Sequence, residues 1–131
     1  GLAGIHCCGN ADWSMILNTK VDIVNFDAFG YMEKVMLYPA DIKKFFGRGG
    51  ALAWGVVPAG AFTGNETAEL LVSKLEAGIQ RLQQEGIDKK TILRQSLITP
   101  SCGMGSLTPD KAEAILKLLR EVSDRMQKKI V

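Results

Sequence analysis

The sequence predicts an α/β domain with a parallel sheet, and three observations lead to this. Four short apolar segments alternate with stretches of helical spacing, so each strand returns to the next one through a helix. The third apolar segment, ALAWGVVPAG, is apolar on both faces, as a buried parallel strand is. The chain has 131 residues, which is the size of a single domain.

The expected elements alternate in order along the chain. The expected strands are LAGIHC at 2–7, VDIVNFDAF at 21–29, ALAWGVVPAG at 51–60 and TILRQSLITP at 91–100. After the first strand, Asn10 or Asp12 can cap a short helix in NADWSMILNT. Residues 29–50 are expected to form a helical connection that is broken at Pro39 and ended by glycines.

Two longer helices follow the third and fourth strands. One runs from Glu66 to Glu85 and is ended by Gly86; a stripe at spacings of three and four comprises Leu70, Leu71, Lys74, Leu75, Gly78, Ile79 and Leu82. The last helix begins with Thr108 as N-cap and Pro109 in its first turn. Its predicted apolar face comprises Ile115, Leu116, Leu119 and Val122.

Two architectures fit four such units. One is an open doubly wound sheet, and the other is four of the eight units of a (β/α)₈ barrel. A glycine-rich phosphate loop between a strand and a helix would favour the first. The glycines of GRGGALAWG precede a strand, so they indicate a turn and not a phosphate loop.

The composition excludes several classes of protein. The 16 basic and 14 acidic residues are mixed along the chain, and the net charge is +2, so no nucleic-acid or membrane surface is indicated. No apolar run approaches the roughly 20 residues that a membrane span requires. Three cysteines, two of them adjacent, suit a reducing compartment better than a disulfide framework. A cytoplasmic location is therefore expected.

Candidate metal ligands gather at the strand ends. On an extended strand His6 and Cys8 point to one side, whereas Cys7 points to the other side and is expected to pack behind the strand. Cys102 follows the fourth strand and Asp27 follows the second, and the ends of parallel strands meet at one edge. Nitrogen, two sulfurs and a carboxylate suit tetrahedral zinc. The alternative is that the histidine and cysteines are merely buried.

Four segments resemble the carboxyl-terminal part of the cobalamin-independent methionine synthase and uroporphyrinogen decarboxylase superfamily. They are IHCCGNADW, DIVNFDAF, ALAWGVVPAG and TPSCGMGSLTPDKA, in this order. The resemblance implies that residues 1–131 form a single half-barrel domain, strands five to eight of a (β/α)₈ barrel. It also implies His6, Cys8 and Cys102 as zinc ligands. Asp27 stands where the methionine synthases have glutamate, so the fourth ligand is Asp27, solvent or substrate.

The activity that this resemblance implies is zinc-dependent transfer of a methyl group to a thiol. The donor would be a methylfolate or a methylcorrinoid, and the acceptor a small-molecule thiol held by zinc. Trp54 is expected to pack in the core or between helix and sheet, but it is a candidate substrate contact if the third strand faces inward. Met104 lies beside Cys102 and is another candidate contact, with packing in an exposed loop as the alternative. The alternatives are a noncatalytic zinc-binding or assembly module and a metal-free protein like uroporphyrinogen decarboxylase.

A half barrel also needs a partner. Its two outer strands have unpaired edges, which natural proteins seldom leave bare. The chain is therefore expected to be a fragment, or else to pair as a homodimer or with another protein that carries the missing half.

Overall fold

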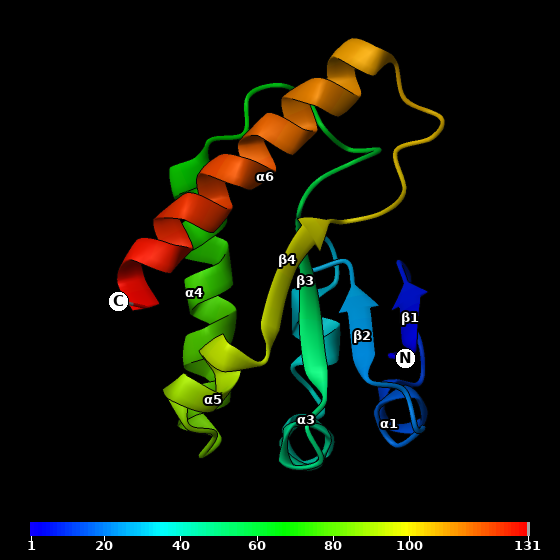
Figure 1. Ribbon diagram of the computed structural model, residues 1–131, viewed down its shortest axis with the longest axis vertical. Coiled ribbons are helices and arrows are strands. Elements are labelled where there is room, and N and C mark those ends of the chain that lie inside the picture. Colours follow the sequence, from blue (N-terminus) through cyan, green and yellow to red (C-terminus); the bar gives the residue numbers. More distant parts are fainter. Residues whose placement is uncertain (131) are drawn as a thin grey trace.

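The computed structural model describes residues 1–130 as an α/β fold with one four-stranded parallel sheet, as predicted (Figure 1). All three strand pairs are parallel. The strands are β1 (Gly4–Cys7), β2 (Ile23–Phe26), β3 (Ala51–Val57) and β4 (Ser96–Pro100).

The strands lie in the sheet in the order β1-β2-β3-β4, so neighbours in sequence are neighbours in space. A doubly wound sheet reverses its strand order at a switch point, where its ligand binds. The described strands contain no such reversal, which argues against the doubly wound alternative. It also makes β1 and β4 the two outer strands of the described sheet.

Short helices connect the first three strands. Helix α1 (Trp13–Leu17) is capped by Asp12, whose carboxylate accepts a hydrogen bond from the Met15 N–H at 3.1 Å. The connection from β2 to β3 is broken as predicted into α2 (Met32–Val35) and α3 (Pro39–Gly47), because Pro39 lacks an N–H and therefore suits the first turn of the second helix.

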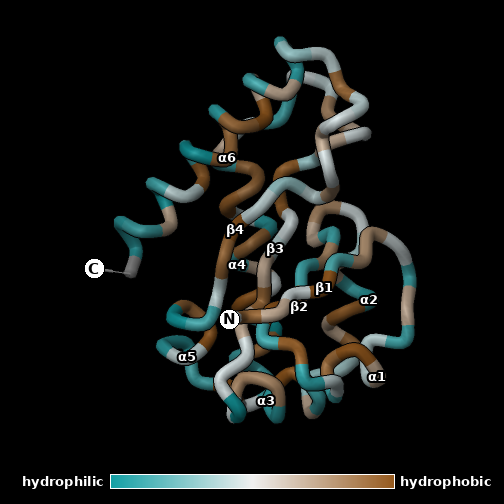
Figure 2. The backbone as a smooth tube through the Cα atoms, turned by 45° about the vertical axis from the view of Figure 1, so that its right-hand side comes forward, coloured by the Kyte–Doolittle hydropathy of each residue, from teal (hydrophilic) through white to brown (hydrophobic). Residues whose placement is uncertain are grey.

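Two long helices follow the third and fourth strands. In α4 (Ala68–Gln84) most of the predicted stripe is buried, whereas Leu70 is 52% exposed. In α6 (Pro109–Ile130), Ile115 and Val122 are buried as predicted, whereas Leu116 is 49% exposed. The Thr108 hydroxyl accepts from the Lys111 N–H, as an N-cap does. Figure 2 shows hydrophobic residues on the side of α6 that faces the sheet and hydrophilic residues on its outer turns.

The prediction of a strand throughout residues 91–100 is wrong in its first half. Residues Lys89–Arg94 form helix α5, and β4 begins only at Ser96. The cause is local: the Asp88 carboxylate caps the Thr91 N–H, so the first turn of a helix is satisfied there. Ile92 then turns into the core instead of pairing in the sheet.

One face of the sheet packs against the helices. Phe26 of β2 lies between Trp13 of α1 and Trp54 of β3, with ring centroids at 6.2 and 5.3 Å. Trp54 in turn abuts Gly78 of α4, where a Cβ would lie 2.9 Å from the indole ring. The alternation of the strands therefore sends the intervening residues, such as Asn25, to the opposite face.

Arg48, directly after α3, holds the turn between α1 and β2. Its guanidinium donates to the carbonyl oxygens of Leu17, Thr19 and Val21 at 2.5 to 3.2 Å. It also lies 4.8 Å from the centroid of the Phe45 ring. This contact therefore holds the turn that leads from α1 into β2. Among the described residues, no helix has both the length and the apolar character to cross a membrane.

Candidate metal centre

The structure brings His6, Cys8 and Cys102 together at the carboxyl ends of the strands. One ligand atom of each residue lies within 4.8 Å of the others. His6 belongs to β1, Cys8 is the first residue after that strand, and Cys102 lies in the loop after β4. The group thus joins the two outer strands of the described sheet.

The loop after β4 closes this distance. Adjacent strands are about 4.8 Å apart, so in a flat sheet β1 and β4 would lie about 14 Å apart. In Figure 1 the yellow loop that leaves β4 runs across the carboxyl ends of the strands toward β1. Cys102 is therefore carried over β2 and β3 to reach the histidine and the first thiol.

Ser101 anchors this loop beside Cys102. Ser101 is only 6% exposed. Its N–H donates to the Val57 carbonyl at 2.8 Å, and its hydroxyl oxygen accepts from the Ala59 N–H at 3.0 Å. Val57 is the last residue of β3 and Ala59 follows it. These two hydrogen bonds therefore hold the loop after β4 against the loop after β3. The position of Cys102 thus depends on a serine that the sequence analysis did not single out.

Gly55 makes the close approach of these segments possible. A Cβ at this position would lie 2.6 Å from the Phe26 carbonyl oxygen and 2.8 Å from the Ser101 Cα. Both are backbone atoms, which cannot move aside as a flexible side chain can. A glycine at position 55 therefore allows the end of β2 and the segment after β4 to approach β3 this closely.

Asn25 supports His6 from the neighbouring strand. Its Oδ1 lies 2.6 Å from His6 Nδ1, and its Nδ2 donates to Ala53 O at 2.9 Å and to Thr99 Oγ1 at 2.8 Å. The sequence analysis missed Asn25. The available signal was that asparagine is depleted in strands, and that the alternation of VDIVNF places it on the face opposite the apolar core residues.

The two exposed thiols have opposite pKa shifts. The Cys8 pKa is raised, mainly because its thiol hydrogen bonds to Cys102 and lies near that sulfur's charge. The Cys102 pKa is lowered, mainly because the His6 ring hydrogen bonds to its sulfur, with further hydrogen bonds from Cys8 and the Gly103 N–H. Of the two thiols, Cys102 therefore loses its proton more readily, which suits it to bind a cation between the three side chains.

The donor set fits zinc. Zinc prefers thiolate sulfur and imidazole nitrogen, and three protein ligands with an open fourth position are typical of its catalytic sites. With Zn–S and Zn–N bonds of about 2.3 and 2.0 Å, ligand atoms on a tetrahedral ion lie about 3.5 Å apart. The three side chains are exposed, so rotation about their χ angles can supply the remaining contraction from 4.8 Å.

Asp27 and Cys7 occupy other surroundings. The Asp27 carboxylate accepts a hydrogen bond from the Gly30 N–H at 2.8 Å in the turn after β2, and the group of three ligands does not include it. Cys7 is half-buried and packs against the core. The structure thus brings together three of the four predicted ligands, and places Asp27 in a turn.

The two predicted substrate contacts differ in position. Trp54 is fully buried, and its Nε1 donates to Ser96 Oγ at 2.9 Å. Trp54 faces Gly78 of α4, which agrees with packing between helix and sheet; its role as a substrate contact stays a prediction. Met104 lies two residues beyond Cys102, half-buried against the core.

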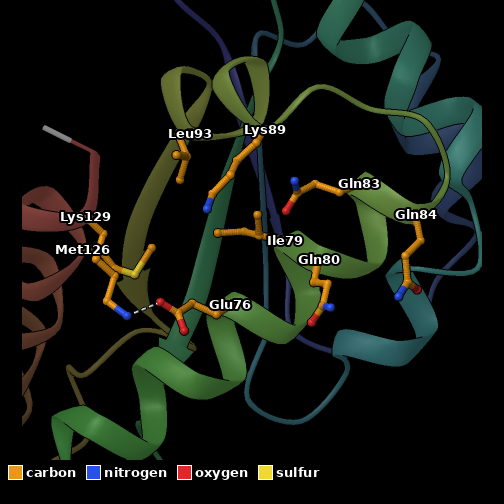
Figure 3. A pocket seen from close by; sticks show the side chains of 9 residues that line it. All are labelled: Glu76, Ile79, Gln80, Gln83, Gln84, Lys89, Leu93, Met126 and Lys129. Atoms are coloured by element: carbon orange, nitrogen blue, oxygen red, sulfur yellow. Dashed lines mark hydrogen bonds and ion pairs between the residues drawn. The ribbon is translucent and has the colours of Figure 1, made fainter.

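A separate surface depression of about 500 Å³ lies between α4, α5 and α6 (Figure 3). Its lining comprises Glu76, Ile79, Gln80, Gln83, Gln84, Lys89, Leu93, Met126 and Lys129. Glu76 and Lys129 form an ion pair across it. Helix α5 precedes β4, so this depression lies toward the amino ends of the strands, away from the thiols.

Comparison with known proteins gives a likeness of fold. No protein-family model matches the sequence, and no curated protein matches it significantly. Among solved structures, the chain is similar to a B12-independent methionine synthase from a Shewanella species, determined in complex with selenomethionine, with a TM-score of 0.70. The match has 16% sequence identity and covers 98% of this chain but only 39% of that chain. The chain thus shares the fold of part of that synthase.

Proposed function

We propose that this chain is half of a (β/α)₈ barrel and that His6, Cys8 and Cys102 bind zinc for methyl transfer to a thiol. One observation carries the proposal: the ligand atoms of these three residues lie within 4.8 Å of one another, although they lie in or directly beyond the two outer strands. The fold shared with part of a B12-independent methionine synthase supports the same interpretation.

The half-barrel assignment is supported by topology. Sequential parallel strands joined by helices are the units of a (β/α)₈ barrel, whose sites lie at the carboxyl ends of the strands. The four units would correspond to strands five to eight. The candidate ligands gather at that end of the sheet, and the helices pack against one face of it, so the opposite face would be the barrel interior.

The three side chains would each contribute one ligand atom. His6 offers a ring nitrogen, and Cys8 and Cys102 offer sulfurs, of which Cys102 loses its proton more readily because its pKa is lowered. Bound zinc would supply Lewis acidity that lowers the pKa of an acceptor thiol. The exposure of all three ligands leaves the fourth side of the group open to that thiol. Free thiol ligands require a reducing compartment, so we place the protein in the cytoplasm.

The transfer itself balances without an oxidant or a reductant. The bond from the methyl group to the folate nitrogen or the corrinoid cobalt breaks, and a bond to the acceptor sulfur forms. The thiol proton passes to solvent, and the folate nitrogen takes up a proton, whereas a corrinoid would leave with the bonding electron pair on its cobalt. The described residues leave the ligands exposed, so the walls that hold a methylfolate or a methylcorrinoid must come from beyond this half barrel.

A second half barrel is the partner that this arrangement requires. Within residues 1–130 the outer strands β1 and β4 each have one unpaired edge, and Ile5 and Leu97 on them are 40% and 48% exposed. The missing half would be a second copy of the chain, another protein, or a further segment of a longer chain. Light scattering of the purified chain would separate a homodimer from a monomer.

The zinc site is tested by metal content. Purified under reducing conditions with zinc supplied, the chain should contain about one zinc, and His6→Ala and Cys102→Ala should lose it. Cys7→Ala is the matched control, because Cys7 is half-buried against the core and should not affect the metal. A folded, reduced chain without zinc would overturn the site and leave a metal-free relative.

Activity is tested separately. The zinc-loaded protein, with its partner if one is found, would be incubated with small thiols and either a methylfolate or a methylcorrinoid donor. Formation of the methyl thioether, lost in Cys102→Ala, would support the methyltransferase. Zinc binding with no transfer to any thiol would favour the noncatalytic zinc-binding module instead.

A further inference from the structure

We propose that Asn25 is a positioning residue that keeps the proton of neutral His6 on Nδ1 and so leaves Nε2 free for the metal. The inference rests on the zinc site proposed above, because it concerns how one of its ligands is prepared. It goes further by assigning a role to Asn25, and through it to Thr99, which binds no metal itself.

A chain of hydrogen bonds crosses the open face of the sheet. It begins at His6 Nδ1, which lies 2.6 Å from Asn25 Oδ1. The Asn25 Nδ2 group then donates to Ala53 O at 2.9 Å and to Thr99 Oγ1 at 2.8 Å. The Thr99 hydroxyl donates to Pro100 O at 2.9 Å. The chain thus spans all four strands, from β1 to the end of β4.

The direction of each hydrogen bond follows from the two carbonyl groups. A backbone carbonyl only accepts, so Ala53 requires the NH₂ group of Asn25 on its side. Pro100 takes the Thr99 proton, so Thr99 can only accept from Asn25. Turning the Asn25 amide over would place two acceptor oxygens about 2.9 Å apart at Ala53, without a proton between them.

The consequence for His6 is a single neutral tautomer. With its NH₂ group held by two acceptors, Asn25 presents Oδ1 to the imidazole, and that oxygen can only accept. His6 must therefore carry a proton on Nδ1. Without a metal, the hydrogen bond between the ring and the Cys102 sulfur then falls to Nε2, which shares the proton of that thiol; with a metal, the Nε2 lone pair is free to bind it. Nε2 is then the ring nitrogen that remains for the group formed with Cys8 and Cys102.

Burial and packing hold Asn25 in place. Asn25 and Thr99 are half-buried, whereas Ala53 between them is only 3% exposed. The register pairs Asn25 with both His6 and Ala53, so the amide lies beside the histidine and over a small side chain. Hydrogen bonds with limited access to water are stronger, and a buried amide without partners is costly.

Such a partner matters for metal binding. A histidine ligand with its second nitrogen held by a hydrogen bond is fixed in tautomer and ring orientation, and removing that partner lowers metal affinity about 10- to 100-fold. Asn25→Leu replaces the amide with an apolar side chain of similar size, and so removes the acceptor for the His6 Nδ1 proton. Asn25→Asp keeps an acceptor for the Nδ1 proton but loses both donated hydrogen bonds, so it separates the tautomer effect from stability.

The first experiment reads the tautomer without zinc. The ¹⁵N spectrum of the His6 ring is recorded in mildly alkaline buffer on the Cys102→Ser protein, in which no thiol at position 102 can share a proton with the ring. We expect the proton on Nδ1 with Asn25 or with Asn25→Asp, and a mixture of both tautomers with Asn25→Leu. A proton on Nε2 while Asn25 is present would overturn the proposal.

The second experiment measures zinc affinity by competition with a chromophoric chelator, in proteins with both thiols. Asn25→Leu should weaken binding about 10- to 100-fold, whereas Asn25→Asp should stay within a few-fold of the native chain. Thr99→Val should weaken zinc binding less than Asn25→Leu does, and Thr99→Ser, which keeps the hydroxyl, is the matched control.

An equal loss of zinc affinity in Asn25→Asp and Asn25→Leu would overturn the positioning role. A chain that shows the Nδ1 tautomer and binds no zinc would overturn the metal site and leave the tautomer assignment standing.

Discussion

The Asn25 amide of β2 donates a hydrogen bond to the Thr99 hydroxyl of β4 at 2.8 Å, although β3 lies between the two strands. The contact passes over Ala53, whose methyl group leaves room for it. The same amide lies 2.6 Å from His6 on the other side. A small residue in the middle of the sheet thus allows a polar connection between its two outer strands.

A larger side chain at position 53 should break the hydrogen bond between Asn25 and Thr99. Ala53→Val adds two methyl groups at a position that is 3% exposed, beneath the Asn25 amide. We expect a loss of about 1–3 kcal/mol in the free energy of unfolding, measured by urea denaturation. The zinc affinity should fall along with it. Unchanged stability and affinity would show that the contact over β3 contributes little.

Gly55→Ala should disturb the site through the backbone. The added Cβ would meet the Phe26 carbonyl and the Ser101 Cα at less than 3 Å, so the loop that carries Cys102 must move. We expect a loss of at least about 2 kcal/mol in stability, together with weaker zinc binding. Gly60→Ala is the matched control, because nothing lies within 4 Å of a Cβ there. Similar effects of both substitutions would contradict the argument.

Alkylation should distinguish the three cysteines. The thiolate is the reactive form, and the Cys102 pKa is lowered whereas the Cys8 pKa is raised. Without metal, iodoacetamide should therefore modify Cys102 before Cys8 near neutral pH. Raising the pH should narrow the difference, because Cys8 then loses its proton as well. Half-buried Cys7 should react slowly throughout.

Bound zinc should change the order in which iodoacetamide modifies the cysteines. It should protect Cys8 and Cys102 from alkylation and leave the reactivity of Cys7 unchanged, as measured by mass spectrometry of the digested protein. Equal rates for Cys8 and Cys102 in the metal-free chain would contradict the pKa assignment. Rates that zinc leaves unaffected would contradict the ligand assignment.

Arg48→Ala should lower stability without touching the site. The guanidinium donates to three backbone carbonyls and stacks on Phe45, but it is exposed, so we expect a loss of about 1–2 kcal/mol in the free energy of unfolding. Lys43→Ala in the preceding helix is the control, since within residues 1–130 its side chain is exposed and makes no hydrogen bond; it should change stability by less than about 0.5 kcal/mol. A smaller effect of Arg48→Ala than of the control would contradict the role of this contact.

The sequence by itself determined the alternation of strands and helices and the parallel sheet. These follow from local signals: apolar segments of strand length, the Asp12 and Thr108 caps, and Pro39 at a helix start. The one error in element type, helix α5 in place of a longer strand, arose where the Asp88 cap outweighed β-branched residues. The two-residue period of a strand is also enough to place His6 and Cys8 on one side.

Only the tertiary structure decided which side chains meet across the sheet. The alternation of β3 did not reveal that Trp54 faces α4, because a strand buried on both faces has no polar side to orient it. Asn25 meets Thr99, and Ser101 holds the Cys102 loop, through contacts between residues 74 and 42 positions apart in the chain. Such contacts depend on strand register and on the close backbone approach at Gly55. Both are properties of the packed sheet, and no single segment encodes them.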